Sequence, residues 1–112
     1  CAGHAARALG CEAAVDYARG YPVLVNEAGC AAEARQAAAA LFGADALLPE
    51  PSPLMAGEDF AYYARMRPAC YAFFGAGNAV KGITAPNHAA EFDLDEEQLY
   101  RAAAWFAALA CR

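Results

Sequence analysis

The sequence predicts an α/β fold, and three patterns in its 112 residues indicate this class. Residues 70–74 form a continuous apolar run of strand length, which is typical of a strand covered by helices on both faces. Residues 12–25 alternate apolar and polar side chains, as expected for a strand with one face in water. Helical patterns occupy residues 27–42 and the region that follows Asp95. Strands that alternate with helices are typical of a layered α/β domain.

The N-terminal segment reads as the end of one helix followed by an edge strand. Residues 2–10 carry a helical pattern, and Gly10 stands where a glycine commonly closes a helix. No capping residue precedes Cys1, so we expect these residues to belong to a longer protein. Pro22 interrupts the alternating segment and has no amide hydrogen, which confines that strand to a sheet edge or a bulge.

The helix over residues 27–42 has signals at both ends. Asn26 is a favourable capping residue, and Glu27 suits the positive end of the helix dipole. Gly43 closes the pattern. A short strand is predicted at 46–50.

Two further helices follow the proline-rich residues 50–53, which should be extended or turned because residues before proline avoid helical angles. Gly57, Glu58 and Asp59 begin a helix that runs to about Met66, with both acids in its first turn. The last helix starts with the capping box Asp95-x-x-Gln98. Its expected apolar stripe comprises Leu99, Ala102, Ala103, Phe106, Leu109 and Ala110.

Composition excludes some classes of partner and location. The net charge is −5 and no basic run occurs, so nucleic acid is not an expected partner. No apolar segment approaches the roughly 20 residues that cross a bilayer, and no signal peptide is visible. The five cysteines show neither zinc-ribbon nor redox spacing, and Cys70 is expected to act as a small core residue. Reduced thiols indicate a cytoplasmic protein.

The residues alone leave the chemistry open. His88 lies in a loop after the apolar run, where it could be a metal ligand or an ordinary surface residue. Glu58 and Asp59 could act as a carboxylate pair or simply favour the helix terminus. Gly75 and Gly77 permit close backbone approach to a ligand, which is also what any tight turn requires. Neither a phosphate-binding loop nor a nucleophile elbow is present.

Four stretches together resemble the C-terminal end of a known family. These are Met55–Tyr63 (Met-Ala-Gly-Glu-Asp-Phe-Ala-Tyr-Tyr), Ala72–Asn78 (Ala-Phe-Phe-Gly-Ala-Gly-Asn), Gly82–Asp93 with its Thr-Ala-Pro-x-His core, and Val15–Asn26. In this order and spacing they are similar to the dinuclear-metal amidohydrolases and metallopeptidases. That family includes hippurate hydrolase, indole-acetyl-amino-acid hydrolases, aminoacylase and the carboxypeptidase that removes glutamate from folates.

The resemblance implies an architecture. Family members have a catalytic α/β domain, similar to zinc exopeptidases, into which an α+β lid or dimerisation domain is inserted. Residues 1–26 would then be the last helix and strand of the lid, and residues 27–112 the C-terminal part of the catalytic domain. A homodimer formed through the lid is expected. Tyr21 and Asn26 would lie near the hinge between the two domains.

The resemblance also implies an activity and a set of site residues. Members bind two divalent metals, usually zinc and in some cases manganese, nickel or cobalt, and hydrolyse the amide bond of N-acyl amino acids or small peptides. A metal-bound water attacks the carbonyl. His88 falls on the family's last metal-ligand histidine. The turns at Gly57–Asp59 and at Gly75 and Gly77 would border the substrate site.

Two departures limit these expectations. Ala89 and Ala90 stand where the family usually has a proline and a polar residue. The other metal ligands and the base glutamate lie upstream in the family, so no catalytic residue is assigned within these 112 residues. We therefore expect the chain alone to be inactive and to bind little or no metal. The alternative from another class is a free-standing interaction or dimerisation module that keeps the fold without catalysis.

Overall fold

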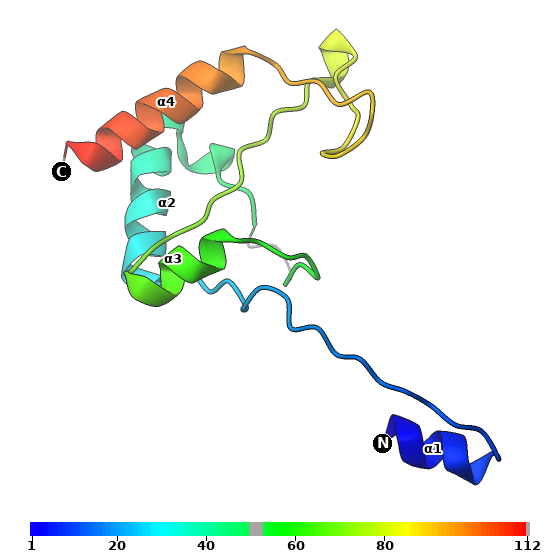
Figure 1. The fold of residues 1–112 in the computed structure, drawn as a ribbon. Helices are drawn as coiled ribbons and strands as arrows, with labels where there is room; N and C mark the ends of the chain where they lie inside the picture. The colour runs from blue at the N-terminus through cyan, green and yellow to red at the C-terminus, as the bar shows by residue number, and fades with distance from the viewer. Residues whose placement is uncertain (50–52, 112) are drawn as a thin grey trace.

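The computed structural model describes residues 1–49 and 53–111, and this part of the chain is largely helical (Figure 1). No ladder of paired strands occurs in it, and its only β pairing is the single bridge between Asn78 and Ile83. No helix among these residues has the length and apolar character needed to cross a bilayer. The elements in order are α1 (Ala2–Ala8), α2 (Ala28–Phe42), the 3₁₀ turn η1 (Ala44–Ala46), α3 (Phe60–Met66), the 3₁₀ turn η2 (Ala79–Lys81) and α4 (Glu97–Ala110).

The core lies where α4 crosses α2 (Figure 1). Ala34 and Ala37 of α2 are buried against Trp105 of α4, and the indole N–H of Trp105 donates to the Ala34 carbonyl over 2.9 Å. Small residues on α2 let the large indole approach the helix backbone closely. Phe74 closes the cluster with an edge-to-face contact to Trp105, at a ring separation of 5.2 Å.

The buried stripe of α4 differs from the predicted one. Leu99 and Phe106, both expected inside, are 57% and 64% exposed, whereas Trp105 is 5% exposed. The residues of α4 that join the cluster with α2 are Trp105 and Leu109, four positions apart on one face of the helix. The physical reason is the size of the indole, which gains more from burial than the smaller side chains of the expected stripe.

The first turn of α2 corrects the predicted cap. Glu27, not Asn26, is the N-cap, and its carboxylate accepts from the Cys30 amide over 2.7 Å. Hydrogen bonds from the Gly29 and Cys30 amides lower the pKa of Glu27. The Asn26 side chain is engaged elsewhere: its amide donates to the Tyr71 carbonyl (2.9 Å) and accepts from the Tyr71 amide (2.8 Å). Together with the bond from the Glu27 amide to the Ala69 carbonyl, this ties the start of α2 to the segment after α3.

The apolar run at 70–74 is not part of a ladder in the structure. It lies in the long non-helical segment that leaves α3 and passes the α2–α4 core (Figure 1). Cys70 and Phe74 pack against the core as predicted for apolar residues, and burial raises the pKa of the Cys70 thiol. Phe73 is 66% exposed. A strand needs a neighbour to satisfy its backbone groups, and no neighbour pairs with this run within the described residues.

The predicted edge strand at 12–25 is likewise unpaired. The structure assigns no helix or ladder to these residues, and they lead from α1 to α2 as an open segment (Figure 1). Val15, Tyr17, Val23 and Val25, which share one face of the predicted strand, are all exposed, so that face is uncovered, whereas Pro22 and Leu24 on the other face are half-buried. Residues 47–49 of the predicted strand at 46–50 are also without a ladder, and residues 50–52 lie outside the described part. The α/β class therefore stays a prediction.

The molecule is far more open than a compact domain of its length. Its radius of gyration is 20.2 Å, against about 13 Å for a compact chain of this size. Its accessible surface is 9306 Å², against about 5,900 Å² for a compact 11.7 kDa monomer. Much apolar surface that a globular domain would cover thus faces solvent.

Candidate functional site

His88 lies in the loop of residues 84–94, between η2 and α4, and is exposed. Its backbone is left-handed, with φ of 68°, and among the described residues it is the only non-glycine with a positive φ. The His88 amide donates to the Asn87 side chain over 3.1 Å. An exposed imidazole in a conformation that most residues avoid is consistent with a functional role, because such strain clusters at functional sites.

Gly57, Glu58 and Asp59 precede α3 and do not belong to it, since the helix begins at Phe60. The Glu58 carboxylate accepts from the Phe60 amide over 3.1 Å. This bond, with a further one from the Tyr71 phenol, holds the pKa of Glu58 below its usual value. Glu58 therefore accepts from an otherwise free amide at the start of the helix. This is the structural role that the sequence offers as the alternative to a carboxylate pair.

The glycines at the two predicted turns differ in how closely they are approached. A Cβ on Gly57 would come within 3.0 Å of the Tyr21 ring, and one on Gly77 within 3.3 Å of the Ile83 carbonyl. A Cβ on Gly75 would meet nothing within 4 Å. At Gly57 and Gly77 the close approach is thus made by the chain itself.

The structure does not bring the predicted site residues together. The loop that carries His88 lies beyond η2, apart from the segment that enters α3 with Gly57–Asp59 (Figure 1). No hydrogen bond or ion pair joins His88 to either glycine turn in residues 1–49 and 53–111.

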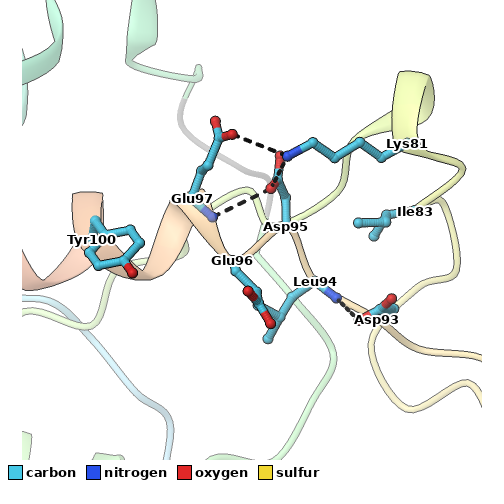
Figure 2. Close-up of a pocket in the computed structure, with 8 residues that line it drawn as sticks. All are labelled: Lys81, Ile83, Asp93, Leu94, Asp95, Glu96, Glu97 and Tyr100. Carbon is cyan, nitrogen blue, oxygen red and sulfur yellow. Dashed lines mark hydrogen bonds and ion pairs between the residues drawn. The ribbon is translucent and has the colours of Figure 1, made fainter.

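A polar cluster that the sequence analysis did not identify lies at the start of α4 (Figure 2). Asp95 is 4% exposed, and its two carboxylate oxygens accept from Lys81 Nζ and Asn78 Nδ2, each over 2.7 Å. Lys81 also reaches Glu97 over 3.3 Å. The bonds from Asn78 and Lys81 hold the pKa of Asp95 below its usual value, and the carboxylate raises the pKa of Lys81. An open depression of about 410 Å³ adjoins the cluster and is lined by Ile83 and Tyr100 among others.

Comparison with known proteins identifies the family. The sequence pattern of peptidase family M20/M25/M40 matches residues 5–112. The chain belongs to this family. Its members are generally metal-dependent peptidases.

Relatives of similar sequence are named as hydrolases. An uncharacterized hydrolase of Staphylococcus aureus (strain N315) is 32% identical over 79% of this chain and 23% of its own length. An uncharacterized hydrolase of Staphylococcus haemolyticus (strain JCSC1435) is 33% identical over 82% of this chain and 24% of its own. The M20 chain thus spans about a quarter of the length of the curated relatives it matches. No solved structure is significantly similar to it.

The described residues do not by themselves make up a metal centre of an M20 peptidase. A dinuclear site needs several converging ligands, and in residues 1–49 and 53–111 no three His, Cys, Asp or Glu side chains come together in a suitable group. The buried carboxylate of Asp95 already accepts hydrogen bonds from Lys81 and Asn78 on its two oxygens. His88 is therefore a single candidate ligand without partners in this part of the chain.

Proposed function

We propose that these residues are the C-terminal part of a metal-dependent amidohydrolase that cleaves the amide bond of N-acyl amino acids or small peptides. One observation carries the proposal: the M20 pattern matches residues 5–112, while relatives named as hydrolases are about four times longer than the matched segment. Such an enzyme needs ligands and a base that these residues do not supply.

The open structure supports an assignment to two domains of a larger α/β protein. Residues 1–26 would end the lid or dimerisation domain, and residues 27–112 would end the catalytic domain. The unpaired segments 12–25 and 70–74 are suited to pair with strands elsewhere in such a protein, since their backbone groups have no ladder here. The surface in excess of a compact monomer is what missing layers would cover. A cytoplasmic homodimer, joined through the lid, completes the proposal.

Within that enzyme, His88 would supply one ligand to a pair of divalent metals, with zinc favoured over manganese, nickel or cobalt. Exposure and a free imidazole support this role, because its ring makes no hydrogen bond within the described residues. The metals would activate a water for attack on the amide carbonyl. Gly57, Glu58, Asp59, Gly75 and Gly77 would shape the substrate site through their turns.

Metal removal from the full-length protein tests the function. Dialysis against a chelator is expected to lower kcat/KM for an N-acyl amino acid by at least about 1,000-fold, because metal stabilisation of a developing charge is worth several kcal/mol. Adding zinc back should restore the rate. Undiminished activity after the metal content has fallen below about one-tenth of an equivalent would sink the metal-dependent mechanism, and no activity even with metal bound would favour the non-catalytic module.

The isolated 112-residue chain should bind zinc weakly. One imidazole offers a single ligand, whereas tight zinc sites need three or four. Calorimetric titration is expected to give no submicromolar binding. Submicromolar binding that disappears in His88→Ala would show that partners for His88 exist within this chain, contrary to the proposal.

A further inference from the structure

We propose that Asp95 is a positioning residue which, with Asn78 and Lys81, holds both ends of the loop that carries His88. We refer to Asn78, Lys81 and Asp95 as the clamp and to residues 84–94 as the His88 loop. The proposal rests on the proposed function for the role of His88. The placement of the loop ends, however, follows from contacts of the described residues alone.

The first end of the loop is fixed by a tight turn. Asn78 and Ile83 exchange two backbone hydrogen bonds, of 2.8 and 2.9 Å, just before the loop begins. The Asn78 side chain accepts from the Val80 and Lys81 amides inside this turn. The same amide group then donates to Asp95 over 2.7 Å, so the turn is tied directly to the far end of the loop.

The second end is fixed at Asp95 itself (Figure 2). The Asp95 amide donates to the Ala76 carbonyl over 2.8 Å, next to the turn. Its carboxylate accepts from Lys81 Nζ and, over 3.4 Å, from the Glu97 amide in the first turn of α4. One buried carboxylate therefore joins the turn before the loop to the helix after it.

Between these two ends the loop has only local support. The Ala89 amide donates to the Pro86 carbonyl and the Phe92 amide to the Ala89 carbonyl, and no hydrogen bond joins residues 84–94 to the rest of the described chain. His88 itself is exposed. The position of its imidazole is thus set by where the clamp holds the loop ends.

Both side chains that meet the Asp95 carboxylate are donors, which makes Asp95→Asn a sharp test. Asn78 presents an amide N–H and Lys81 an ammonium, each to a different oxygen. An asparagine has only one acceptor oxygen, so its NH₂ must face one of the two donors. The change keeps the size of the side chain while it breaks the clamp. Glu96→Gln is the matched control, because Glu96 is an exposed acid beside Asp95 with no side-chain cap bond.

The experiment uses the full-length protein and two readouts. Hydrogen–deuterium exchange of peptides that cover 76–83 and 93–97 should be about tenfold faster in Asp95→Asn than in wild type, because the anchoring bonds open locally. The zinc dissociation constant should rise about 10- to 100-fold, as is typical when a group that orients a ligand is lost. Glu96→Gln should change neither readout. Lys81→Met is a second variant, to be used if Asp95→Asn does not fold. It keeps the bond between Asn78 and Asp95, so both readouts should change in the same direction but by less.

Each result decides one question. Exchange rates and zinc affinity in Asp95→Asn and Lys81→Met that equal those of Glu96→Gln would overturn the proposal. Faster exchange with unchanged zinc affinity would show a purely structural clamp and would also overturn it. If His88→Ala leaves zinc binding intact, the proposed function fails, and the exchange rates alone then decide whether the clamp holds the loop.

Discussion

Replacing His88 with alanine in the full-length protein is expected to lower kcat/KM by at least about 100-fold and to reduce the bound metal. Loss of a group that merely orients a ligand costs 10- to 100-fold in affinity or activity, so loss of a direct ligand should cost at least the upper figure. Metal content by elemental analysis and initial rates on an N-acyl amino acid measure the two effects together.

The chain offers its own control, because it contains only two histidines. His4 lies in α1, which stands apart from the α2–α4 core (Figure 1). His4→Ala removes the same type of side chain from a different place, and should leave both the metal content and the rate unchanged. A His88→Ala protein with full activity and a full complement of metal would show that this loop histidine is an ordinary surface residue, which is the alternative that the sequence leaves open.

The helices were the part of the fold that could be predicted from sequence, because their determinants are local. The pattern over 27–42 and the closing Gly43 gave α2 to within one residue of Ala28–Phe42. Even there the sequence favours Asn26 as the cap, whereas the N-cap in the structure is Glu27. The reason is a contact with Tyr71, 45 residues away, that no local pattern reveals.

The strands could not be settled in the same way, because a strand is stabilised by a neighbour. Alternation at 12–25 and the apolar run at 70–74 describe faces that are suited to burial. Neither pattern states where the neighbour comes from, and the described residues provide none. These segments have no ladder within the described residues, and the α/β class stays a prediction.

The candidate site shows the same division between local and distant information. The motif around His88 identified a loop, but not the left-handed backbone of the histidine. The spacing Asp95-x-x-Gln98 predicts a capping box, but the N-cap of α4 is Glu96 and the Asp95 amide donates to the Ala76 carbonyl instead. The bonds of the Asp95 carboxylate to Asn78 and Lys81 span 17 and 14 residues, and the capping pattern says nothing of them. A lysine and an asparagine ahead of a loop, with an acid after it, is the signal that could have suggested the clamp.

Trp105→Ala is expected to cause the largest loss of stability in this chain, about 3–5 kcal/mol, since it replaces the only tryptophan with a methyl group. Trp105 is the one large residue of the buried cluster, whose other members are the alanines Ala34 and Ala37. The substitution also removes the indole hydrogen bond to Ala34. A loss of this size approaches the whole unfolding free energy of a small domain, so the contact between α2 and α4 should be abolished.

Phe106→Ala is the matched control, because it removes the neighbouring aromatic ring from the same helix. Phe106 is 64% exposed and touches Trp105 edge to face, at a ring separation of 5.0 Å. Its loss should cost only about 0.5–1.5 kcal/mol. Urea unfolding followed by circular dichroism compares the two, since Trp105→Ala has no tryptophan fluorescence. Equal shifts of the midpoint would mean that the indole does not organise the core, and that the helix crossing depends instead on contacts spread along α4.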